Sequence, residues 1–504
     1  MCILIYRWKN YHIWVAKLKI KTYNLQRKIR KEKNPMKNIK IKDIINITNG
    51  TLIQGNLELE CIEFSKDTRI IKGGEIYIGI KGENFDGNKF WKEALNQGAE
   101  AVIVQDINFK EEELKKFKNK TIIKVKNTLE ALYKIAKFKR ELYDIPVIAI
   151  TGSVGKTSTK DIVANVVSKK YKTLKTEGNN NNNIGMPLTI LKLKDHEAMV
   201  LEMGMNHFGE ISLLTNIAKP NICIITNIGT SHIGNLGSRE NILKAKLEIL
   251  EGTKNPIVII NNDNDLLHKW YEENKEKHNI RTYGIKNQSD FMAKDIKLNE
   301  NSSEFKVIKS KKNKEINTNV PVGGEHFVLN SLCAFTVGKE LEIDEKDITS
   351  GIESFELTKK RMDIIKLKNG VEIINDAYNA SLESMKASLK YLGNIQEKRK
   401  IAVLGDMFEL GKFSEDLHKS VGTEVYKNNI DILICSGESS KKIVKQANTE
   451  GLSTKNTYYV ENKEEILEKL KDICKNGDVV LFKASNGMQF YKIAEEYQKY
   501  VEKN

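Results

Sequence analysis

A glycine-rich turn at residues 152–157 carries the clearest chemical signal in this 504-residue sequence, within the stretch AITGSVGKTS. Two glycines in the turn let backbone N–H groups approach phosphate oxygens without a Cβ in the way. Lys156 supplies a cation for the β- and γ-phosphates, and Thr157 supplies a hydroxyl for Mg²⁺. The usual G-x-x-x-x-G-K-[ST] spacing is broken only at Ile150, which takes the place of the first glycine. We therefore expect a triphosphate-binding loop formed by Gly152, Ser153, Val154, Gly155, Lys156, Thr157 and Ser158.

Two further residues, Glu202 and His232, could bind a metal ion close to this loop. Glu202 ends the predicted strand 198–202, and His232 follows the predicted strand 222–226. The carboxyl ends of parallel strands form the edge at which α/β sheets bind ligands, and a carboxylate is a suitable Mg²⁺ ligand. Taken singly, Glu202 could equally be a capping acid, and a lone histidine is more often structural. Their occurrence after two strands beside a phosphate loop favours the metal-binding interpretation for both.

The elements that must position these residues alternate between strands and helices. The buried strand 147–150 runs directly into the glycine turn, and the predicted helix 158–169 follows the turn. Further strands are predicted at 198–202, 222–226 and 257–260, with helical patterns between them. Such alternation is typical of a doubly wound parallel sheet.

The same alternation continues on both sides of this region. Short elements precede Pro146, with strands at 76–80 and 101–104 and a helix at 90–98. After Thr358, strands are predicted at 401–404, 432–435 and 479–482. With roughly 150 residues per domain as a guide, we predict an α/β fold of three domains. They are a smaller α/β N-terminal domain (36–145), a central domain with a doubly wound P-loop-type parallel sheet (146–357) and a Rossmann-like C-terminal domain (358–504).

The composition is that of an ordinary globular protein, with 40% hydrophobic and 30% charged residues. This excludes a wholly disordered chain. No apolar stretch approaches the roughly 18–20 residues that span a bilayer, so stable membrane insertion is not expected. The six cysteines form no CxxC pair, which argues against a disulfide framework or a structural zinc site. A cytoplasmic location fits this use of cysteine.

Much of the net charge of +15 comes from the first 35 residues, which carry ten lysines and arginines and one acid. The rest of the chain is only mildly basic, at +6, and we therefore do not expect a nucleic-acid partner. The basic extension 1–35 contains Trp8 and Trp14 and could lie on an anionic membrane surface. The alternative, which we favour, is that translation starts at Met36 and the extension is a mis-assigned start.

Longer motifs in all three regions add to this interpretation. They are SKDTR at 65–69, GENFDGN at 82–88, TEGNNNNNIGMPLT at 176–189, KRMD at 360–363, NDAYNAS at 375–381 and GDMFELG at 405–411, followed by His418. Together with the glycine turn, these motifs resemble the Mur ligase family of ATP-dependent amide ligases, which extend the peptide stem of peptidoglycan precursors. The resemblance covers nearly everything from Met36 onward. The GDMFELG motif resembles the corresponding motif of the family branch that adds D-alanyl-D-alanine.

The resemblance implies roles for residues that the pattern alone would leave as ordinary surface groups. Lys246 matches a lysine that many members carry as a carbamate, which converts a cation into a metal-binding anion. The implied ligands of two Mg²⁺ ions are Thr157, Glu202, His232 and Lys246, and the implied catalytic residues are Lys156, Glu202, His232 and Lys246. Besides the loop, the implied ATP contacts are Asn262, Asp263, His326, Asn330, Arg361 and Asp376. The implied substrate contacts are Ser65, Thr68, Arg69, Asn180, Asn181, Asn379, Asp406, Lys483 and Ser485.

The resemblance also implies a reaction. The terminal carboxylate of UDP-N-acetylmuramoyl-tripeptide would attack the γ-phosphate of ATP, and the amine of D-alanyl-D-alanine would then displace phosphate from the acyl phosphate. The products would be UDP-N-acetylmuramoyl-pentapeptide, ADP and phosphate, and the family precedent is a monomer. Two alternatives stay open: a related ligase that adds the third stem residue, and a catalytically impaired nucleotide-binding homologue.

Two positions depart from the family pattern. Leu382 stands where a proline usually follows the NDAYNAS motif, which changes the stiffness of a turn. Asn486 stands where the family motif K-[GA]-S-R has its arginine. One cation expected near the phosphates or the peptide carboxylate is therefore missing, and this departure is what keeps the impaired homologue open.

Overall fold

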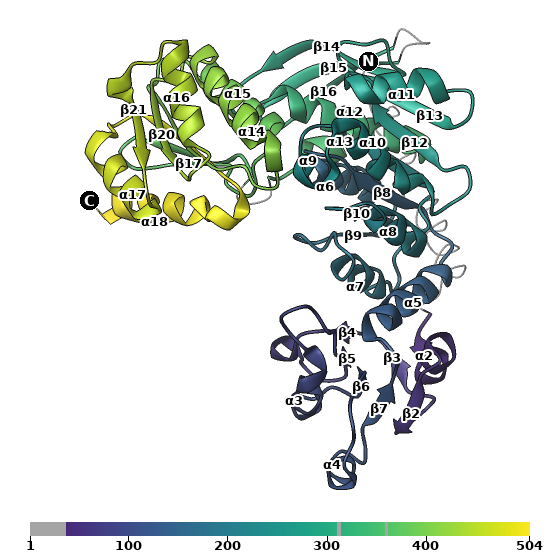
Figure 1. Cartoon of the computed structure of the whole chain (residues 1–504). Helices are drawn as coiled ribbons and strands as arrows, with labels where there is room; N and C mark the ends of the chain where they lie inside the picture. Colours follow the sequence, from purple (N-terminus) through teal and green to yellow (C-terminus); the bar gives the residue numbers. More distant parts are fainter. Residues whose placement is uncertain (1–36, 310–313, 358–360, 504) are drawn as a thin grey trace, which may run out of the picture. The chain divides into compact units, whose positions relative to one another are not determined.

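The computed structural model describes residues 37–309, 314–357 and 361–503 (Figure 1). The predicted basic extension 1–35 lies outside the described residues. The chain divides into two compact units. The first contains the described residues up to Val147 together with Tyr171–Met199 and Asn216–Lys219, and the second contains the rest. None of the described helices is long and apolar enough to cross a membrane.

The first unit is built around a five-stranded sheet in the order β2-β7-β6-β5-β4. The pairs from β4 to β7 are parallel, and β2 joins the edge antiparallel to β7. Strand β6 is entirely apolar and entirely buried, as expected of a strand covered on both faces. The strands are β1 (Ile39–Lys40), β2 (Thr51–Gln54), β3 (Glu60–Cys61), β4 (Phe64–Ser65), β5 (Ile76–Ile78), β6 (Ala101–Val104) and β7 (Thr121–Lys124). The helices before residue 147 are α2 (Ile41–Thr48), α3 (Trp91–Asn96), α4 (Glu111–Lys116) and α5 (Thr128–Glu141).

A nine-stranded sheet carries the glycine turn, in the order β16-β15-β14-β13-β12-β11-β8-β10-β9. Strands β8 and β11 to β14 pair in parallel, and β14, β15 and β16 form an antiparallel meander at one edge. The strands are β8 (Val147–Thr151), β9 (Thr173–Lys175), β10 (Ala198–Glu202), β11 (Ile222–Ile225), β12 (Ile257–Asn261), β13 (Asn279–Gly284), β14 (Phe291–Leu298), β15 (Ser303–Lys309) and β16 (Glu315–Val320). The helices are α6 (Lys156–Ser168), α7 (Gly185–Leu191), α8 (Glu210–Ala218), α9 (Ile233–Leu236), α10 (Arg239–Leu247), α11 (Asp265–Asn274), α12 (Glu325–Glu340) and α13 (Glu345–Glu353).

The residues after 361 form a six-stranded sheet in the order β17-β18-β22-β19-β20-β21. Only the edge strand β17 is antiparallel to its neighbour, and the other pairs are parallel. The strands are β17 (Asp363–Lys366), β18 (Glu372–Asn375), β19 (Lys400–Gly405), β20 (Ile432–Ser436), β21 (Thr457–Val460) and β22 (Val479–Lys483). The helices are α14 (Leu382–Asn394), α15 (Ser414–Lys427), α16 (Lys441–Glu450), α17 (Lys463–Ile473) and α18 (Phe490–Lys503).

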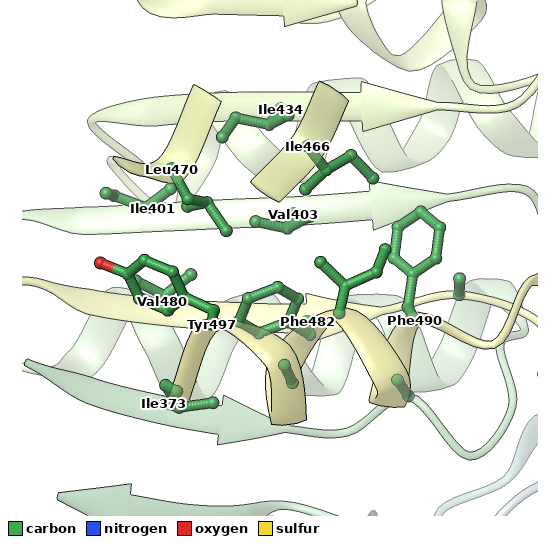
Figure 2. Packing of buried hydrophobic residues seen from close by; sticks show 14 of the residues in the cluster. Ile373, Ile401, Val403, Ile434, Ile466, Leu470, Val480, Phe482, Phe490 and Tyr497 are labelled. Carbon is green, nitrogen blue, oxygen red and sulfur yellow. The ribbon is translucent and has the colours of Figure 1, made fainter. Parts of the chain in front are cut away.

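The core of this last sheet shows why its strands are so uniformly apolar. Ile466 and Leu470 of α17, with Phe490 of α18, pack against strand residues such as Phe482 (Figure 2). Full burial of one such side chain is worth about 1.5–3 kcal/mol. Strands that are covered by helices cannot carry polar groups without losing this stabilisation, and the polar residues are displaced to the strand ends.

The α/β fold with parallel sheets predicted from the sequence is confirmed, and the differences are local. The helix after the glycine turn begins at Lys156 rather than Ser158, because Gly155 already acts as its N-cap with φ of 80°. The helix predicted at 90–98 is shorter and ends at Asn96. Strands β13 to β16 are not among the predicted strands, because their lysine, glutamate and asparagine residues hide a strand pattern. The boundaries at 145 and 357 remain predictions.

Candidate active site

The glycine turn connects β8 to α6. Gly152 has φ of 151° and Gly155 has φ of 80°, values that residues with side chains rarely adopt. A Cβ on Gly152 would lie 1.9 Å from the hydroxyl oxygen of Thr226. The turn can therefore pack directly on the end of β11 only because residue 152 has no side chain.

Residues that follow β11 hold this loop in place. The N–H of Ser153 donates to the carbonyl oxygen of Asn227 at 3.0 Å, and the N–H of Val154 donates to the side-chain oxygen of Asn227 at 3.0 Å. The hydroxyl of Thr226 donates to the carbonyl oxygen of Val154 at 2.8 Å. The first N–H groups of a helix have no acceptor within it, so the start of α6 is where this fixed loop can bind phosphate oxygens.

Lys156 is the first residue of α6, and its side chain folds back over the loop. Its ammonium group donates to the carbonyl oxygens of Gly152 at 2.8 Å and Ser153 at 3.4 Å. Burial lowers the pKa of Lys156, the carboxylate of Glu202 opposes this shift, and the charge of Arg361 adds to it. A polyanion bound at this point would favour the charged ammonium form again.

Thr157 and Glu202 bring the loop and the end of β10 together. The Thr157 hydroxyl donates to a carboxylate oxygen of Glu202 at 2.8 Å, and both side chains are buried. The buried Lys246 of α10 lies within electrostatic range of Lys156. Burial and then the charge of Lys156 hold the pKa of Lys246 well below its ordinary value. The site thus combines two hard oxygen donors with a lysine that is biased towards its neutral amine.

His232 lies in the turn between β11 and α9 and adopts a left-handed conformation with φ of 64°. Its Nδ1 atom is 2.5 Å from a carboxylate oxygen of Glu409, a residue 177 positions further along the chain. The hydrogen bond from His232 lowers the pKa of Glu409, and burial opposes this shift.

The first two turns of α12 carry two further residues of the candidate site, Asn330 and His326. The side-chain oxygen of Asn330 accepts a hydrogen bond from the Thr159 hydroxyl at 3.0 Å. Its amide nitrogen Nδ2 is buried and has no hydrogen-bond partner among the described residues. One helical turn earlier, His326 lines a cavity of about 390 Å³ together with residues of the β14–β15 turn and of α14. Burial lowers the pKa of His326 to about 4, so the ring is neutral.

Comparison with known proteins decides the family. The model of the Mur ligase middle domain matches residues 150–338, that of the Mur ligase glutamate ligase domain matches 360–486, and that of the Mur ligase family catalytic domain matches 65–140. The chain is 36% identical over 460 residues to the UDP-N-acetylmuramoyl-tripeptide–D-alanyl-D-alanine ligase of Bacillus subtilis (strain 168), covering 90% of this chain and 97% of that relative. The chain belongs to the Mur ligase family.

Solved structures agree with this assignment. A crystal structure of MurF from Acinetobacter baumannii is 27% identical, with a TM-score of 0.82, and the match covers 92% of this chain and 100% of that one. A MurF ligase from Thermotoga maritima in complex with ADP is 29% identical, with a TM-score of 0.75, and the match covers 88% and 98%. The sequence-based recognition of the family, of its three-domain α/β fold and of the D-alanyl-D-alanine-adding type is therefore confirmed.

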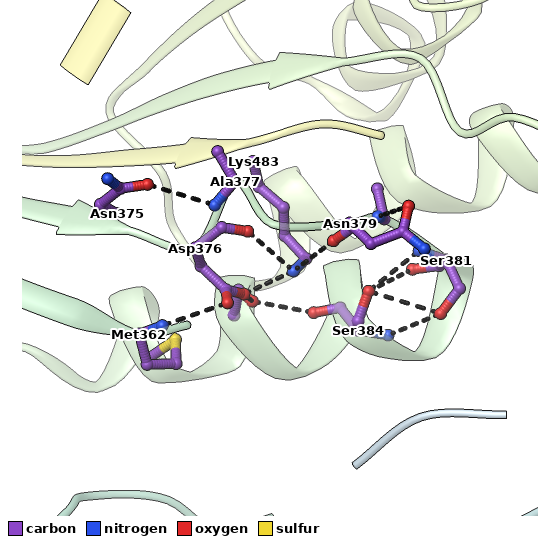
Figure 3. Close-up of polar contacts among 10 residues, drawn as sticks. Met362, Asn375, Asp376, Ala377, Asn379, Ser381, Ser384 and Lys483 are labelled. Atoms are coloured by element: carbon purple, nitrogen blue, oxygen red, sulfur yellow. Dashed lines mark hydrogen bonds and ion pairs between the residues drawn. The ribbon is translucent and has the colours of Figure 1, made fainter. Parts of the chain in front are cut away.

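In this Mur ligase, the buried Lys483 and the largely buried Asp376 form an ion pair at the ends of β22 and β18, with the Lys483 ammonium 2.5 Å from the carboxylate (Figure 3). The carboxylate also accepts hydrogen bonds from the Met362 N–H at 3.1 Å and from the Ser388 hydroxyl at 2.6 Å. Lys483 also donates to the carbonyl oxygen of Asn379 at 3.3 Å. Through these contacts the ion pair holds together the backbone at Met362, the segment after β18 and helix α14, in addition to any contact with a ligand.

Arg361 lies beside this centre, with its guanidinium carbon 3.9 Å from the centre of the Tyr378 ring. Such a stacked guanidinium is held by its flat face while its N–H edges can still bind a phosphate.

The GDMFELG loop is held from three directions. The Asp406 carboxylate accepts the Ser440 N–H at 2.7 Å, the Ser485 hydroxyl oxygen accepts the Phe408 N–H at 2.8 Å, and the buried His418 accepts the Met407 N–H at 3.0 Å. Asp406 and Ser485, both predicted as substrate contacts, thus have roles in shaping this loop. Asn486, the departure from the family pattern, follows directly and is exposed.

Asn262 and Asp263 shape a different loop. The Asp263 carboxylate accepts the N–H groups of Ile285, Lys286 and Asn287 at 2.6, 3.0 and 2.8 Å. The Asn262 side chain donates to the carbonyl oxygen of Gln288 at 2.9 Å. Both side chains therefore hold the turn between β13 and β14, and their contact with a nucleotide remains a prediction.

The remaining predicted substrate residues lie in the first unit, which is described by itself. Thr68 donates to Glu93 at 2.7 Å, and Arg69 pairs with Asp67 at 2.6 Å while remaining exposed. The Ser65 hydroxyl donates to the carbonyl oxygen of Asp67 at 3.0 Å. The side-chain amides of Asn180 and Asn181 donate within their own loop, to the Glu177 carbonyl at 3.0 Å and to the Asn179 side chain at 3.1 Å.

Sequence reasoning missed Glu383 and Glu409. The described residues bring both acids onto the turn after β11, where Glu383 accepts the Thr230 N–H at 2.8 Å. Glu409 lies in the GDMFELG motif, which indicates the branch of the family but assigns no role to this acid. Nothing in the local pattern distinguishes such residues from solvated surface acids, because their partners are more than 150 residues away.

Proposed function

We propose that this Mur ligase joins D-alanyl-D-alanine to UDP-N-acetylmuramoyl-tripeptide at the expense of ATP, through an acyl phosphate. The observation that carries the proposal is the fixed phosphate loop with the Thr157–Glu202 pair at its mouth. The names of the relatives support the choice of substrates. The third stem residue that precedes the new bond is left open.

The triphosphate of ATP would lie on residues 152–158, with Lys156 leaving the carbonyl oxygens of its own loop for the β- and γ-phosphates. The buried amide nitrogen of Asn330 has no hydrogen-bond partner among the described residues, and Asn330 lies one helical turn after His326, which lines the cavity. An amide nitrogen suits an acceptor atom of the nucleotide. We place the base end of ATP there, Arg361 at the phosphates and Asp376 near the ribose.

The residues present also fit a metal site of the kind that holds Mg²⁺. Magnesium prefers oxygen ligands and is usually held by one or two protein groups, with water and phosphates completing its shell. Among the described residues, no group of three or more histidine, cysteine or acidic side chains is arranged so that it could hold a metal ion. The buried Thr157 hydroxyl and Glu202 carboxylate are the hard donors such a sparse site requires.

Lys246 fits the role of a carbamate. Its neutral amine, favoured by burial, is the form that adds carbon dioxide and releases a proton. The resulting anion would join Thr157, Glu202 and His232 as ligands of two Mg²⁺ ions. When bound, these ions would reduce the repulsion between the γ-phosphate and the attacking carboxylate.

The chain's own residues would do the remaining work. Lys156 and the start of α6 stabilise the charge that spreads over the γ-phosphate oxygens during transfer. The carboxylate of the tripeptide forms the acyl–phosphate bond as the bond between the β- and γ-phosphates breaks. The dipeptide amine then forms the amide bond, and phosphate leaves with the electron pair. Holding three reactants in line is a large part of such catalysis.

The other assignments belong to the same proposal. Ser65, Thr68, Arg69, Asn180 and Asn181 would contact the UDP-sugar peptide, and Asn379, Asp406, Lys483 and Ser485 the dipeptide side. We propose domains at 36–145, 146–357 and 358–504, a monomeric state and a cytoplasmic location.

An omission experiment tests the proposed reaction. Purified protein with ATP and Mg²⁺ is expected to release phosphate only when both UDP-N-acetylmuramoyl-tripeptide and D-alanyl-D-alanine are present. If phosphate release requires instead the UDP-N-acetylmuramoyl-dipeptide and a free diamino acid, the chain is the related ligase that adds the third stem residue. ATP binding without turnover under any combination would identify an impaired homologue.

A further inference from the structure

Residues 229–234 comprise the end of the turn after β11 and the first two residues of α9, and are called the turn 229–234 below. Two carboxylates from the region after residue 361 accept hydrogen bonds from this turn. Glu383 accepts the Thr230 N–H at 2.8 Å and the Thr230 hydroxyl at 3.1 Å. Glu409 lies 2.5 Å from Nδ1 of His232, and its backbone carbonyl accepts the Gly234 N–H at 2.9 Å. Both acids therefore reach into the same turn from segments far away in the sequence.

The turn is shaped for this contact. A Cβ on Gly229 would lie 2.5 Å from the carboxylate carbon of Glu383, and one on Gly234 would lie 2.6 Å from the carbonyl oxygen of Glu409. At Gly229 a Cβ would displace the end of the flexible Glu383 side chain, whereas at Gly234 it would meet the backbone of residues 409–411, so a larger residue at 234 would push the two segments apart.

Backbone strain marks the same contact. His232 and Glu409 both have φ of 64°, in the left-handed region that residues other than glycine rarely adopt. Such a conformation persists only where the surroundings impose it. Here two residues with this conformation contact each other through their side chains.

The loop that carries Glu409 is fixed before it meets His232. His418 is fully buried and accepts the Met407 N–H, and its other ring nitrogen contacts the Ser414 carbonyl oxygen at 2.7 Å. Ser485 accepts the next N–H, that of Phe408. Two successive N–H groups immediately before Glu409 are thus anchored, which fixes the backbone that carries this carboxylate.

We propose that Glu409 is a positioning residue that accepts the Nδ1 proton of His232 and thereby leaves Nε2 as the ring nitrogen with a free lone pair. A carboxylate accepts hydrogen bonds, so it selects the tautomer with the proton on Nδ1. The bond exists only while residues 405–411 are docked on the turn 229–234. Docking of the C-terminal region and correct presentation of His232 are therefore one event. The inference rests on the proposed function, because His232 is assigned to the reaction there.

A double-mutant cycle between the two residues tests this role. Glu409→Ala is expected to lower kcat roughly 10- to 100-fold, with the KM for ATP and for the tripeptide changed less than about twofold. Glu409→Gln, whose amide oxygen can still accept the proton, is expected to recover most of kcat. In a His232→Ala background, Glu409→Ala is expected to have no further effect, because Glu409 acts only through the ring.

A second readout does not depend on turnover. With ¹⁵N-labelled histidine, the ring nitrogens of His232 are expected to show the Nδ1-protonated form in the wild type and a mixture in Glu409→Ala. His232→Ala identifies the signals. The matched control is Glu438→Ala, which removes an exposed carboxylate paired with Lys441 at 2.6 Å, and both readouts are expected to match the wild type.

The outcomes separate the two levels of the proposal. If the wild type ligates and Glu409→Ala retains its kcat, or loses kcat equally in the His232→Ala background, the positioning role is overturned. An unchanged ring-nitrogen pattern in Glu409→Ala would overturn it as well. If the wild type itself forms no peptide bond, the proposed function fails, whereas the ring-nitrogen comparison still decides whether Glu409 sets the tautomer.

Discussion

The hydroxyl of Thr157 donates to the carboxylate of Glu202 across 2.8 Å, joining the first turn of α6 to the last residue of β10. Residues 45 positions apart thereby place two buried oxygen donors at the mouth of one phosphate loop. Strand β8, which leads through the glycine turn into α6, is the neighbour of β10 in the sheet, so the start of α6 and the end of β10 lie close together. This arrangement supports the proposed binding of a triphosphate and Mg²⁺ at the glycine turn.

The close packing of the glycine turn gives a first prediction. Gly152→Ala would place a Cβ 1.9 Å from the Thr226 hydroxyl, and the loop must move. We expect ATP binding, measured by titration calorimetry, to be lost. Gly477→Ala is the control, because Gly477 also has positive φ, 86°, yet a Cβ there meets nothing within 4 Å. Gly477→Ala should lose some stability but bind ATP normally, and unimpaired binding by Gly152→Ala would contradict the loop assignment.

Lys246 gives a second prediction. Lys246→Ala keeps a good helix former on α10 and is expected to lower ligation roughly 100-fold or more with little change in the thermal midpoint. Lys244→Ala, an exposed lysine on the same helix, should retain full activity. Wild-type protein equilibrated with ¹³C-bicarbonate should show a carbamate signal that Lys246→Ala lacks. A signal present in both proteins would place the carbamate elsewhere.

The buried pair of Asp376 and Lys483 gives a third prediction, this time on stability. Lys483→Met leaves a buried carboxylate without its cation and is expected to lower the free energy of unfolding by about 3–5 kcal/mol. The double variant Asp376→Asn with Lys483→Met removes both charges and should recover part of that loss. Urea unfolding monitored by circular dichroism measures both. Equal stability of the Lys483→Met protein and the wild type would show that the pair is dispensable.

His326 gives a prediction about pH. Its pKa in the folded protein is about 4, below the ordinary value of 6.5. Between pH 6.5 and pH 4 the ring is therefore protonated in the unfolded chain but still neutral in the folded protein. The stability contribution is complete above pH 6.5 and is lost as the pH falls towards 4, by on the order of 2 kcal/mol at pH 5. Urea unfolding at pH 7 and pH 5 should show a smaller difference for His326→Gln than for the wild type. An equal pH effect in both proteins would mean that the ring is not buried neutral.

The sequence allowed some parts of this account to be predicted and not others, for a physical reason. The loop 152–157 and its flanking elements are local, because a strand, a glycine turn and a helix follow one another within about twenty residues. Lys246 looked like a solvated helix lysine, and only the family resemblance singled it out. The structure adds that its side chain is buried.

The contacts that could not be predicted are those between distant segments. His232 was singled out, but its partner Glu409 was not, because the pair depends on how the region after 361 docks. Likewise, Asp376 and Lys483 were assigned to ligands from motifs, and neither motif reveals that the two side chains are paired with each other. Pairing across more than 100 residues is a property of the fold rather than of the local pattern.

The most direct test of the central claim is detection of the new peptide bond. Purified protein is incubated with ATP, Mg²⁺, UDP-N-acetylmuramoyl-tripeptide and D-alanyl-D-alanine, and the products are identified by mass spectrometry. We expect UDP-N-acetylmuramoyl-pentapeptide from the wild type and none from Lys156→Ala, whose thermal midpoint should stay close to that of the wild type. The absence of the pentapeptide from the wild-type reaction, or an equal yield from Lys156→Ala, would contradict the account.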